Sequence, residues 1–284
     1  MPANFHIARI AQGPYLRMYD ELTASLAASL EDLGHGCTVE VNGLSPGRVN
    51  ILVGSTIFAA RDMQLARHLA GQPYILYQIE QLDDRGGLLP GWPEYRDVMT
   101  GASHIWDYAP ASSAYLRERG FPRVATLPPG YHPCLETFRP APQPDIDVLF
   151  YGSSRPRRDR ILDGLKRAGL RVVRLEHVYG GQRDRMIARA RIVLNIHGWD
   201  GIDALETVRL SFLLANRCFV VSEKSDHDPY GGGVVFAAYD ELIDTCLHYL
   251  RRAPERRLAI AERGYQALKA RSMADSLRPI VGTA

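Results

Sequence analysis

Three polar residues stand close to one strand end in the segment RIVLNIHGWDGIDALETVRL, residues 191–210. Asn195 and His197 lie at the end of the expected strand, and Glu206 lies in the first turn of the helix expected from Ala204. A carboxylate at that position is favoured by the helix dipole. It is also placed to accept hydrogen bonds from the two hydroxyls of a ribose. The residues alone leave both interpretations of Glu206 open.

A second polar group lies at the strand-to-helix junction in DVLFYGSSRPRRDRIL, residues 147–162. Gly152 permits the turn, and Arg155, Arg157 and Arg158 follow it. The helix dipole disfavours cations at a helix N-terminus, which argues against a merely solvated basic helix start. Guanidinium groups and N-terminal amides bind phosphates well, so this junction predicts a diphosphate site.

The first strand of the chain ends in AQGPYLRMYDE, where Gly13 stands at the turn from strand to helix. A helix N-terminus at this point is suited to an anion, although a turn glycine explains the residue equally well. The sequence contains neither GxGxxG nor GxxxxGK[ST]. Their absence argues against a dinucleotide enzyme and against a P-loop NTPase.

Short β-branched runs alternate with helical patterns along the chain. In the first half we expect helices near residues 19–34, 61–71, 93–102 and 112–120, the last opened by serines suited to N-capping. Strands are expected at residues 6–10, 37–41, 50–55, 73–79, 103–109 and 123–128. This alternation predicts βαβ units and parallel sheets, which bind ligands beyond the carboxyl ends of their strands.

A proline-rich segment interrupts the alternation. Residues 128–147 hold six prolines and no periodic pattern, and the alternation restarts at residues 147–152. The segment therefore predicts a linker between two doubly wound domains, residues 1–135 and 136–284. Two such sheets that face each other would form a cleft at the linker.

Composition sets limits on the function. The chain has 284 residues, 46% of them hydrophobic, with a formal net charge of +2, which predicts a globular cytoplasmic protein. That charge gives no electrostatic argument for nucleic acid or membrane binding. No signal peptide, membrane span or HExxH motif is visible, so at most a peripheral membrane association and no metal site are expected. Four widely spaced cysteines indicate free thiols.

The chain resembles the GT-B glycosyltransferases, especially the "glycosyl transferases group 1" type and its CgeB-like relatives. The resemblance is diffuse before residue 128 and is carried by PPGYHP (128–133), residues 147–162 and NIHGWDGIDALETVRLSFLLANRCFVVSE (195–223). It implies the α/β GT-B fold, in which two Rossmann-like domains face each other across a cleft. The first would bind the acceptor and the second the nucleotide-sugar. The last helix of such enzymes often returns to the first domain.

The resemblance also implies roles for single residues. A glutamate at the start of this helix holds the donor ribose, and Glu206 matches it. Arg155 and Arg158 match the basic residues that hold the pyrophosphate. Gly13 matches the glycine loop that meets the same phosphates from the first domain. Gly130 and His132 match the hinge, and both His132 and His197 are candidates for contact with the donor phosphates or sugar.

One position departs from the family's pattern. Retaining group 1 enzymes often carry a second glutamate eight residues before the ribose-binding one, where this chain has Gly198, with Asp200 and Asp203 nearby. Retention or inversion of the sugar configuration therefore stays open. Inversion would need a base from the first domain. Glu80, at a strand end in YQIEQLDD, is the candidate and Asp107 is the reserve.

Together these features predict a metal-independent bacterial or phage glycosyltransferase that moves a hexosyl or pentosyl group. A nucleoside-diphosphate sugar is the co-substrate, and no other cofactor is expected. The acceptor stays open among a glycan, a lipid-linked intermediate, a small molecule and a modified nucleobase. The alternatives are a non-catalytic nucleotide or sugar-phosphate binding protein of the same fold, and a GT-B-shaped epimerase or phosphorylase.

Overall fold

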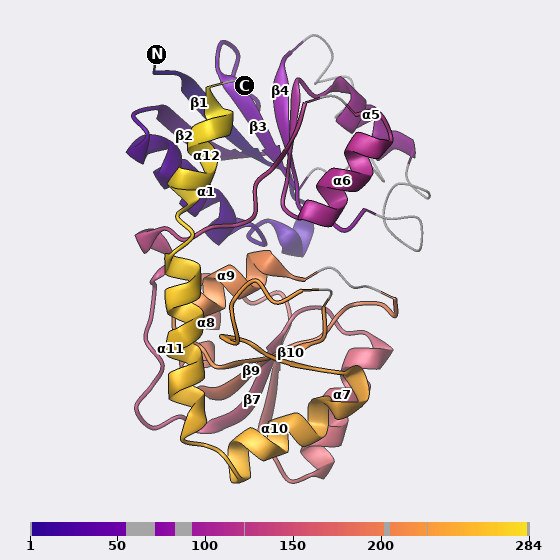
Figure 1. Ribbon diagram of the computed structural model, residues 1–284, viewed down its shortest axis with the longest axis vertical. Coiled ribbons are helices and arrows are strands. Elements are labelled where there is room, and N and C mark those ends of the chain that lie inside the picture. Colours follow the sequence, from indigo (N-terminus) through magenta and orange to yellow (C-terminus); the bar gives the residue numbers. More distant parts are fainter. Residues whose placement is uncertain are drawn as a thin grey trace. The chain divides into compact units, whose positions relative to one another are not determined.

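The computed structural model describes residues 2–54, 72–82, 93–121, 123–201, 205–225 and 227–282. It divides the chain into two compact units (Figure 1). Unit 1 comprises Met1–Cys134 and Ser272–Ala284, and unit 2 comprises Leu135–Arg271. The expected domains, 1–135 and 136–284, differ from these units chiefly in Ser272–Ala284, which belongs to unit 1. The helix expected at 61–71 lies outside the described residues.

Unit 1 contains a parallel sheet with the strand order β2-β1-β3-β4-β5-β6. Its strands are β1 (Asn4–Arg9), β2 (Gly36–Val41), β3 (Val49–Val53), β4 (Tyr74–Gln78), β5 (His104–Asp107) and β6 (Val124–Thr126). The central strand β4 is buried along its whole length, as its apolar run YILYQ requires. All carboxyl ends therefore meet at one edge, which carries the residues after β1, β3, β4 and β5.

The helices of unit 1 are α1 (Asp20–Asp32), α5 (Pro93–Gly101), α6 (Pro110–Glu118) and α12 (Met273–Val281). The last of these, the yellow helix at the C-terminus in Figure 1, packs against α1. The Ser272 hydroxyl caps it by accepting the Asp275 amide at 3.3 Å. The C-terminal segment thus belongs to the first unit.

Unit 2 contains a second parallel sheet with the order β11-β10-β9-β7-β8. Its strands are β7 (Ile146–Tyr151), β8 (Val172–Leu175), β9 (Ala190–Asn195), β10 (Val220–Glu223) and β11 (Val235–Ala237). Its helices are α7 (Pro156–Arg167), α8 (Gly180–Ala188), α9 (Thr207–Ala215), α10 (Leu242–Arg251) and α11 (Arg256–Lys269). β7, β9 and β10 are neighbours, so the loops that follow them lie side by side.

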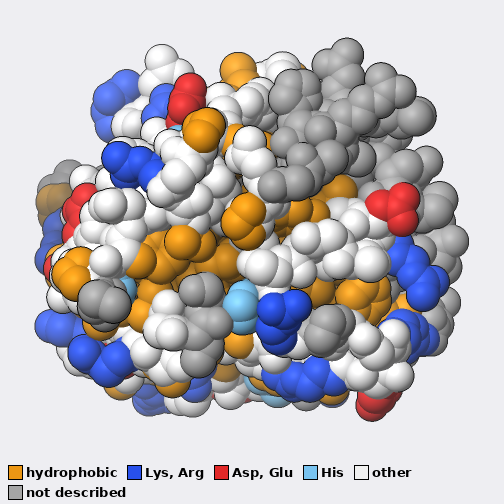
Figure 2. Space-filling view, turned by 90° about the horizontal axis from the view of Figure 1, so that it is seen from above, with side chains coloured by type: hydrophobic (Ala, Val, Ile, Leu, Met, Phe, Trp, Pro, Cys, Tyr) orange, Lys and Arg blue, Asp and Glu red, His pale blue; other side chains and the backbone are white. Residues whose placement is uncertain are grey.

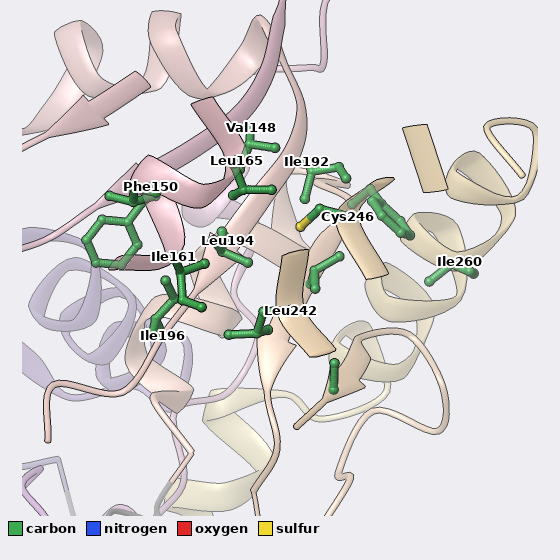
Figure 3. Close-up of a cluster of buried hydrophobic side chains, with 14 of the residues drawn as sticks. Val148, Phe150, Ile161, Leu165, Ile192, Leu194, Ile196, Leu242, Cys246 and Ile260 are labelled. Atoms are coloured by element: carbon green, nitrogen blue, oxygen red, sulfur yellow. The ribbon is translucent and has the colours of Figure 1, made fainter. Parts of the chain in front are cut away.

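The core of unit 2 fixes where those loops begin. Alternate residues of β7 and β9, among them Val148, Phe150, Ile192 and Leu194, pack against Ile161 and Leu165 of α7 and against Leu242 and Cys246 of α10 (Figure 3). Burial of one large aliphatic or aromatic side chain contributes about 1.5–3 kcal/mol, so this packing stabilises the strands together with their backbone pairing. The polar ends of the strands are therefore placed by an apolar core.

Three expected helix starts differ from the structure. The helix after β9 begins at Thr207, so Glu206 is its N-cap residue and not a first-turn residue. Gly13 opens only a three-residue 3₁₀ turn, Gly13–Tyr15, and not the helix whose N-terminus was expected there; α1 itself begins at Asp20, within the expected range of 19–34. Helix α6 begins at Pro110, and the serines expected to cap it lie inside the helix. Proline is favoured at the first helical position, and the Asp107 carboxylate already accepts the Ala109 amide there.

The described residues on one face of the molecule carry dispersed charge. In Figure 2, Lys and Arg side chains lie as separate groups around the described part of one face, with acidic side chains between them. This arrangement agrees with the formal net charge of +2. Among the described helices, none is long and apolar enough to cross a membrane.

Candidate active site

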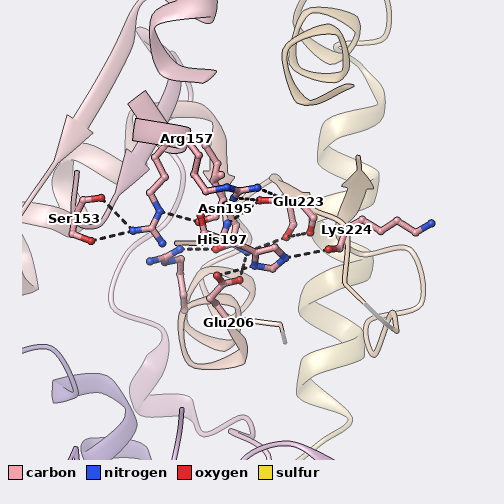
Figure 4. A network of polar contacts seen from close by, with 11 residues as sticks. Ser153, Arg157, Asn195, His197, Glu206, Glu223 and Lys224 are labelled. Atoms are coloured by element: carbon pink, nitrogen blue, oxygen red, sulfur yellow. Dashed lines mark hydrogen bonds and ion pairs between the residues drawn. The ribbon is translucent and has the colours of Figure 1, made fainter. Parts of the chain in front are cut away.

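Glu206 lies at the carboxyl edge of the second sheet and is held from two sides (Figure 4). Its Oε2 accepts a hydrogen bond from Asn195 Nδ2 at 2.8 Å, and its Oε1 lies 3.0 Å from His197 Nδ1. Each carboxylate oxygen has a second lone pair. Because the side chain is 25% exposed, the free lone pairs can accept hydrogen bonds from a ligand.

The charge of Glu206 follows from its neighbours. Burial raises the pKa of a carboxyl group, but here the hydrogen bond and charge of His197, the charge of Arg209 and the Asn195 amide lower the pKa of Glu206 to about 2. The group is therefore an anion at neutral pH. It can only accept hydrogen bonds, as ribose hydroxyls would require.

Asn195, at the end of β9, joins Glu206 to α9 and to the next strand. The side chain is fully buried, and its Nδ2 also donates to Ser222 Oγ at 2.9 Å. Its Oδ1 accepts a hydrogen bond from Arg209 Nη1 at 2.6 Å. A buried amide with all these bonds satisfied is held in one orientation, so it fixes the carboxylate beside it.

Arg158 on α7 points its guanidinium into the same edge. The side chain is only 7% exposed, and its Nε donates to the Ile196 carbonyl at 3.1 Å. Its Nη1 donates to the carbonyl and hydroxyl oxygens of Ser153 at 3.2 and 3.1 Å. Burial, and then the neighbouring charge of Arg209, lower the pKa of Arg158 to about 10. A cation in this position gains from a bound anion.

Two glycines keep the space beside these guanidinium groups free. A side chain at Gly152 would place its Cβ 3.3 Å from Arg209 Nη2, and one at Gly198 would place its Cβ 3.4 Å from Arg158 Nη2. Gly152 also has φ of +148°, which residues with a side chain rarely adopt. At these two positions the loops after β7 and β9 thus place no side chain against the guanidinium groups.

Arg155 and Arg157 differ from Arg158 in what they contact. Arg157 forms a two-pronged ion pair with Glu223, at 2.8 and 2.7 Å, and its Nε donates to Asp200 at 2.8 Å. It therefore joins the loops after β9 and β10 and is engaged by carboxylates. Arg155 is the N-cap residue of α7, and its guanidinium stacks on the ring of Trp199 with 4.0 Å to the centroid. Trp199 itself is 58% exposed.

Several guanidinium groups gather at this edge. Arg157 is paired with Glu223 and Asp200, whereas among the described residues Glu206 contacts His197 and lies close enough to Arg158 and Arg209 for their charges to attract it. Coulomb attraction between close charges is strong where water is partly excluded. The arrangement can hold a dianion next to a group with vicinal hydroxyls, as in a nucleoside diphosphate.

The candidate bases lie at the carboxyl edge of the unit 1 sheet: Glu80 follows β4, and Asp107 is the last residue of the neighbouring β5. Glu80 is partly exposed, and Tyr19 donates a hydrogen bond to its Oε1 at 3.4 Å. Burial, partly offset by that bond, raises the pKa of Glu80 to about 7. Asp107 is fully buried, and its Oδ1 accepts the Ala109 amide at 2.9 Å; burial raises its pKa to about 7 as well. Of these two carboxylates, Glu80 alone is partly exposed.

The remaining predicted residues lie in unit 1. Gly13 is exposed and has φ of +52°, in the turn after β1. The buried Gly130 donates its amide to Met273 Sδ at 3.4 Å. His132 accepts the Cys134 amide on Nδ1 at 3.1 Å, so its Nε2 carries the proton and donates to Asp32 at 3.2 Å. Both ring nitrogens of His132 are therefore engaged within unit 1.

The described residues contain no group of three or more His, Cys, Asp and Glu side chains that could hold a metal ion. The family described as glycosyl transferase-like matches residues 133–276, about half of the chain. The chain belongs to this glycosyl transferase-like family. The match begins just before unit 2 and contains every residue of the Glu206 site.

Solved structures of glycosyltransferases resemble this family member over nearly its whole length. The DNA-modifying β-glucosyltransferase has a TM-score of 0.63 and 12% identity over 98% of this chain and 99% of its own. AviGT4, a glycosyltransferase of avilamycin A biosynthesis, has a TM-score of 0.56 and 16% identity, over 100% of this chain and 99% of its own. An α-glucosyltransferase in complex with UDP and a DNA 13-mer has a TM-score of 0.62 and 9% identity, over 98% of this chain and 99% of its own. The expected GT-B fold of two Rossmann-like domains is thereby confirmed.

Curated relatives of this glycosyl transferase-like chain come from Acanthamoeba polyphaga mimivirus. "Uncharacterized protein L140" is 30% identical over 171 residues, which are 56% of this chain and 55% of that protein. "Uncharacterized protein L138" is 33% identical over 121 residues, which are 40% of this chain and 14% of that protein. The chain thus spans about half the length of L140 and a small part of L138.

Sequence reasoning missed one member of the site and gave no role to another. Arg209 went unnoticed because ALETVRLSFLL looks like an ordinary core helix. The sequence does hold one indication of its role: Arg209 follows Glu206 by three residues, a spacing that places both side chains on the same face at the start of α9. Asn195 was noticed at its strand end, but its bonds to Glu206 and Arg209 depend on contacts across 11 and 14 residues.

Proposed function

We propose that this protein transfers a sugar from a nucleoside-diphosphate sugar to an acceptor without a metal ion. Unit 2 binds the donor and unit 1 binds the acceptor. One observation carries the proposal: an ionised carboxylate, Glu206, lies beside two largely enclosed guanidinium groups at the carboxyl ends of β7 and β9. Family membership supports the reaction class.

In this proposal the Glu206 carboxylate binds the ribose. Its two oxygens each keep a free lone pair, and a vicinal diol presents two hydroxyl donors at matching spacing. Asn195 and His197 prevent the carboxylate from rotating away. A carboxylate that is already held in this orientation loses no side-chain freedom when the ribose binds.

The diphosphate binds to Arg158 and Arg209, with Arg155 at the rim. Negative charge develops on the diphosphate as the bond from the anomeric carbon to the phosphate oxygen breaks. Fixed cations beside that oxygen stabilise the transition state more than the ground state. Gly152 and Gly198 let the phosphate oxygens approach the two guanidinium groups. These arginines supply the positive charge that other enzymes take from a metal ion.

The acceptor is activated by Glu80. A base with a pKa near 7 is ionised in a useful fraction at neutral pH and still accepts a proton readily. Glu80 takes the proton of the acceptor hydroxyl, whose oxygen attacks the anomeric carbon as the diphosphate leaves on the opposite side. We propose inversion because the position of the family's second glutamate is Gly198, which cannot serve as a nucleophile.

The same glycine favours a second candidate function. A protein that lacks the family's second carboxylate, and in which Glu80 is not a base, would bind a nucleotide-sugar without transferring the sugar. The first experiment is a thermal-shift screen with nucleoside diphosphates and their sugars. At about 100 times its dissociation constant a ligand adds roughly 2.7 kcal/mol of stability.

Turnover separates the two candidates. Incubation with the stabilising donor and a panel of glycans, lipid-linked sugars, small molecules and modified DNA should release free nucleoside diphosphate with one acceptor class. The DNA class is included because two of the similar structures are named as DNA-modifying or DNA-bound enzymes. If a donor stabilises the protein but no acceptor leads to release of nucleoside diphosphate, the result favours a protein that binds a nucleotide-sugar without transferring the sugar. No stabilisation by any nucleotide contradicts both.

A further inference from the structure

His197 is bonded on both sides of its ring to atoms that only accept hydrogen bonds. Its Nδ1 lies 3.0 Å from Glu206 Oε1, and its Nε2 lies 3.1 Å from the carbonyl oxygen of Lys224 (Figure 4). A neutral imidazole carries one N–H and one bare nitrogen. In this position the bare nitrogen would face an oxygen lone pair, in a side chain that is only 1% exposed. Two N–H groups are required to satisfy both contacts.

We propose that His197 is held as an imidazolium ion and acts as a positioning residue that orients the Glu206 carboxylate for the donor ribose. The ring does not itself touch the donor, because both nitrogens are used within unit 2. The positioning role rests on the proposed function. The charge of the ring does not, because it follows from the two acceptors alone.

The charged groups around His197 come from α7, α9, β10 and the loops after β9 and β10. Glu206 is the N-cap of α9, and Arg209 stands on the same helix. Glu223, at the end of β10, accepts the His197 amide at 3.0 Å. Arg157 and Arg158 approach from α7, on the carbonyl oxygens of His197 and Ile196. Asp200 and the side chain of Lys224 lie in the adjoining loops and are exposed.

The two carboxylates outweigh the effect of burial. Burial disfavours the charged ring, whereas Glu206, the Lys224 carbonyl and Glu223 favour it, and the pKa of His197 is raised. The sign of the pH dependence follows from that direction. The stabilisation is complete below the pKa of an unfolded histidine and is lost as the pH rises through the raised value. Donor affinity should follow the same course.

Two substitutions divide the two hydrogen bonds between them. The amide nitrogen of asparagine reaches the place of Nδ1, and that of glutamine reaches the place of Nε2. His197→Asn therefore keeps a donor for Glu206, whereas His197→Gln keeps a donor for the Lys224 carbonyl. Both remove the charge. If His197 served only the stability of the fold, the two variants would not differ in their affinity for the ribose.

The affinity test uses uridine diphosphate, a nucleotide present in several of the similar structures. His197→Gln should bind it about ten-fold more weakly than His197→Asn, and should lose most of the wild-type preference for it over 2′-deoxyuridine diphosphate. Wild-type affinity should fall as the pH rises from about 6 to about 9, and neither variant should show this fall. The exposed His227→Asn is the matched control and should behave as wild type.

The charge of the ring is measured separately, on wild-type protein without ligand, by ¹⁵N NMR of the histidine side chains. Both ring nitrogens of His197 should be protonated near neutral pH. A single protonated nitrogen overturns the imidazolium. Equal affinities and 2′-deoxy penalties in the Asn and Gln variants overturn the positioning role. If wild-type protein binds another nucleoside diphosphate instead, the same comparison uses that nucleotide and its 2′-deoxy form. If it binds no nucleoside diphosphate, the proposed function fails and the positioning role fails with it, while the NMR result still decides the charge.

Discussion

Glu206 and Arg209 bind opposite ends of one buried amide: Asn195 donates Nδ2 to the carboxylate at 2.8 Å and accepts the guanidinium on Oδ1 at 2.6 Å. The anion and the cation of the candidate site are thus held by the same side chain at the end of β9. A ligand that carries a diol and a phosphate would contact both ends of this chain of bonds. The position of one group therefore depends on the position of the other.

Removal of the enclosed cations should weaken diphosphate binding. Arg158→Gln and Arg209→Gln should each lower the affinity for uridine diphosphate by about 1.5–3 kcal/mol, the range of a charge-assisted hydrogen bond. Uridine, which lacks the diphosphate, should lose little. Arg160→Gln is the control, because Arg160 is exposed on the same helix as Arg158. Titration calorimetry of the three variants measures this, and equal affinities in all three would place the diphosphate elsewhere.

Arg157 should matter for folding more than for binding. Its ion pair with Glu223 has side chains only 12% and 10% exposed, so Arg157→Gln leaves a nearly buried carboxylate unpaired. The free energy of unfolding should fall by about 3 kcal/mol. Glu223→Gln in the same chain should restore part of the loss, because the uncompensated charge is then gone. Denaturant unfolding of the two single variants and the double variant tests this, and additive losses would show that the pair is not coupled.

Stability should fall as the pH rises from about 5 to about 8, because the pKa values of two carboxyl groups, Asp107 and Glu80, are raised in the folded protein. Burial raises the pKa of Asp107 from 3.8 to about 7, so between these values the unfolded chain releases a proton that the folded chain keeps. A folded-state pKa that lies one pH unit above the unfolded value lowers stability by about 1.4 kcal/mol once both states are ionised. Asp107→Asn should make the decline shallower, measured by urea unfolding at about pH 5 and about pH 8. The exposed Asp97→Asn should keep the wild-type slope; an equal slope in Asp107→Asn would mean that the carboxyl is already ionised.

Periodicity and glycine placement were enough to predict much of the fold. The alternation of β-branched runs with helical patterns predicted two parallel sheets, because strands buried on both faces must be apolar throughout. The strand-to-helix junction at Gly152 and the strand end at Asn195 were also located, because in parallel sheets such loops share one edge. These features depend on residues close together in the sequence.

The features that sequence reasoning missed depend on distant partners. Arg157 was one of the residues expected at the phosphate site, but it pairs with Glu223, which lies 66 residues away in the sequence. Glu206 was expected inside the helix, since a cap is defined by backbone angles that the side-chain pattern does not reveal. The doubly engaged ring of His197 likewise requires the Lys224 carbonyl, 27 residues away.

The central claim is that Glu206 holds the donor ribose, and 2′-deoxy ligands test it most directly. Titration calorimetry gives the affinities of wild type and Glu206→Ala for uridine diphosphate and 2′-deoxyuridine diphosphate. Loss of the 2′-hydroxyl should cost wild type about 1.5–3 kcal/mol and the variant far less, because its partner is already gone. Lost stability alone decides nothing, since an acid at a helix N-terminus also stabilises the helix. Equal 2′-deoxy penalties in the two proteins would contradict the account, because Glu206 would then not bind the ribose.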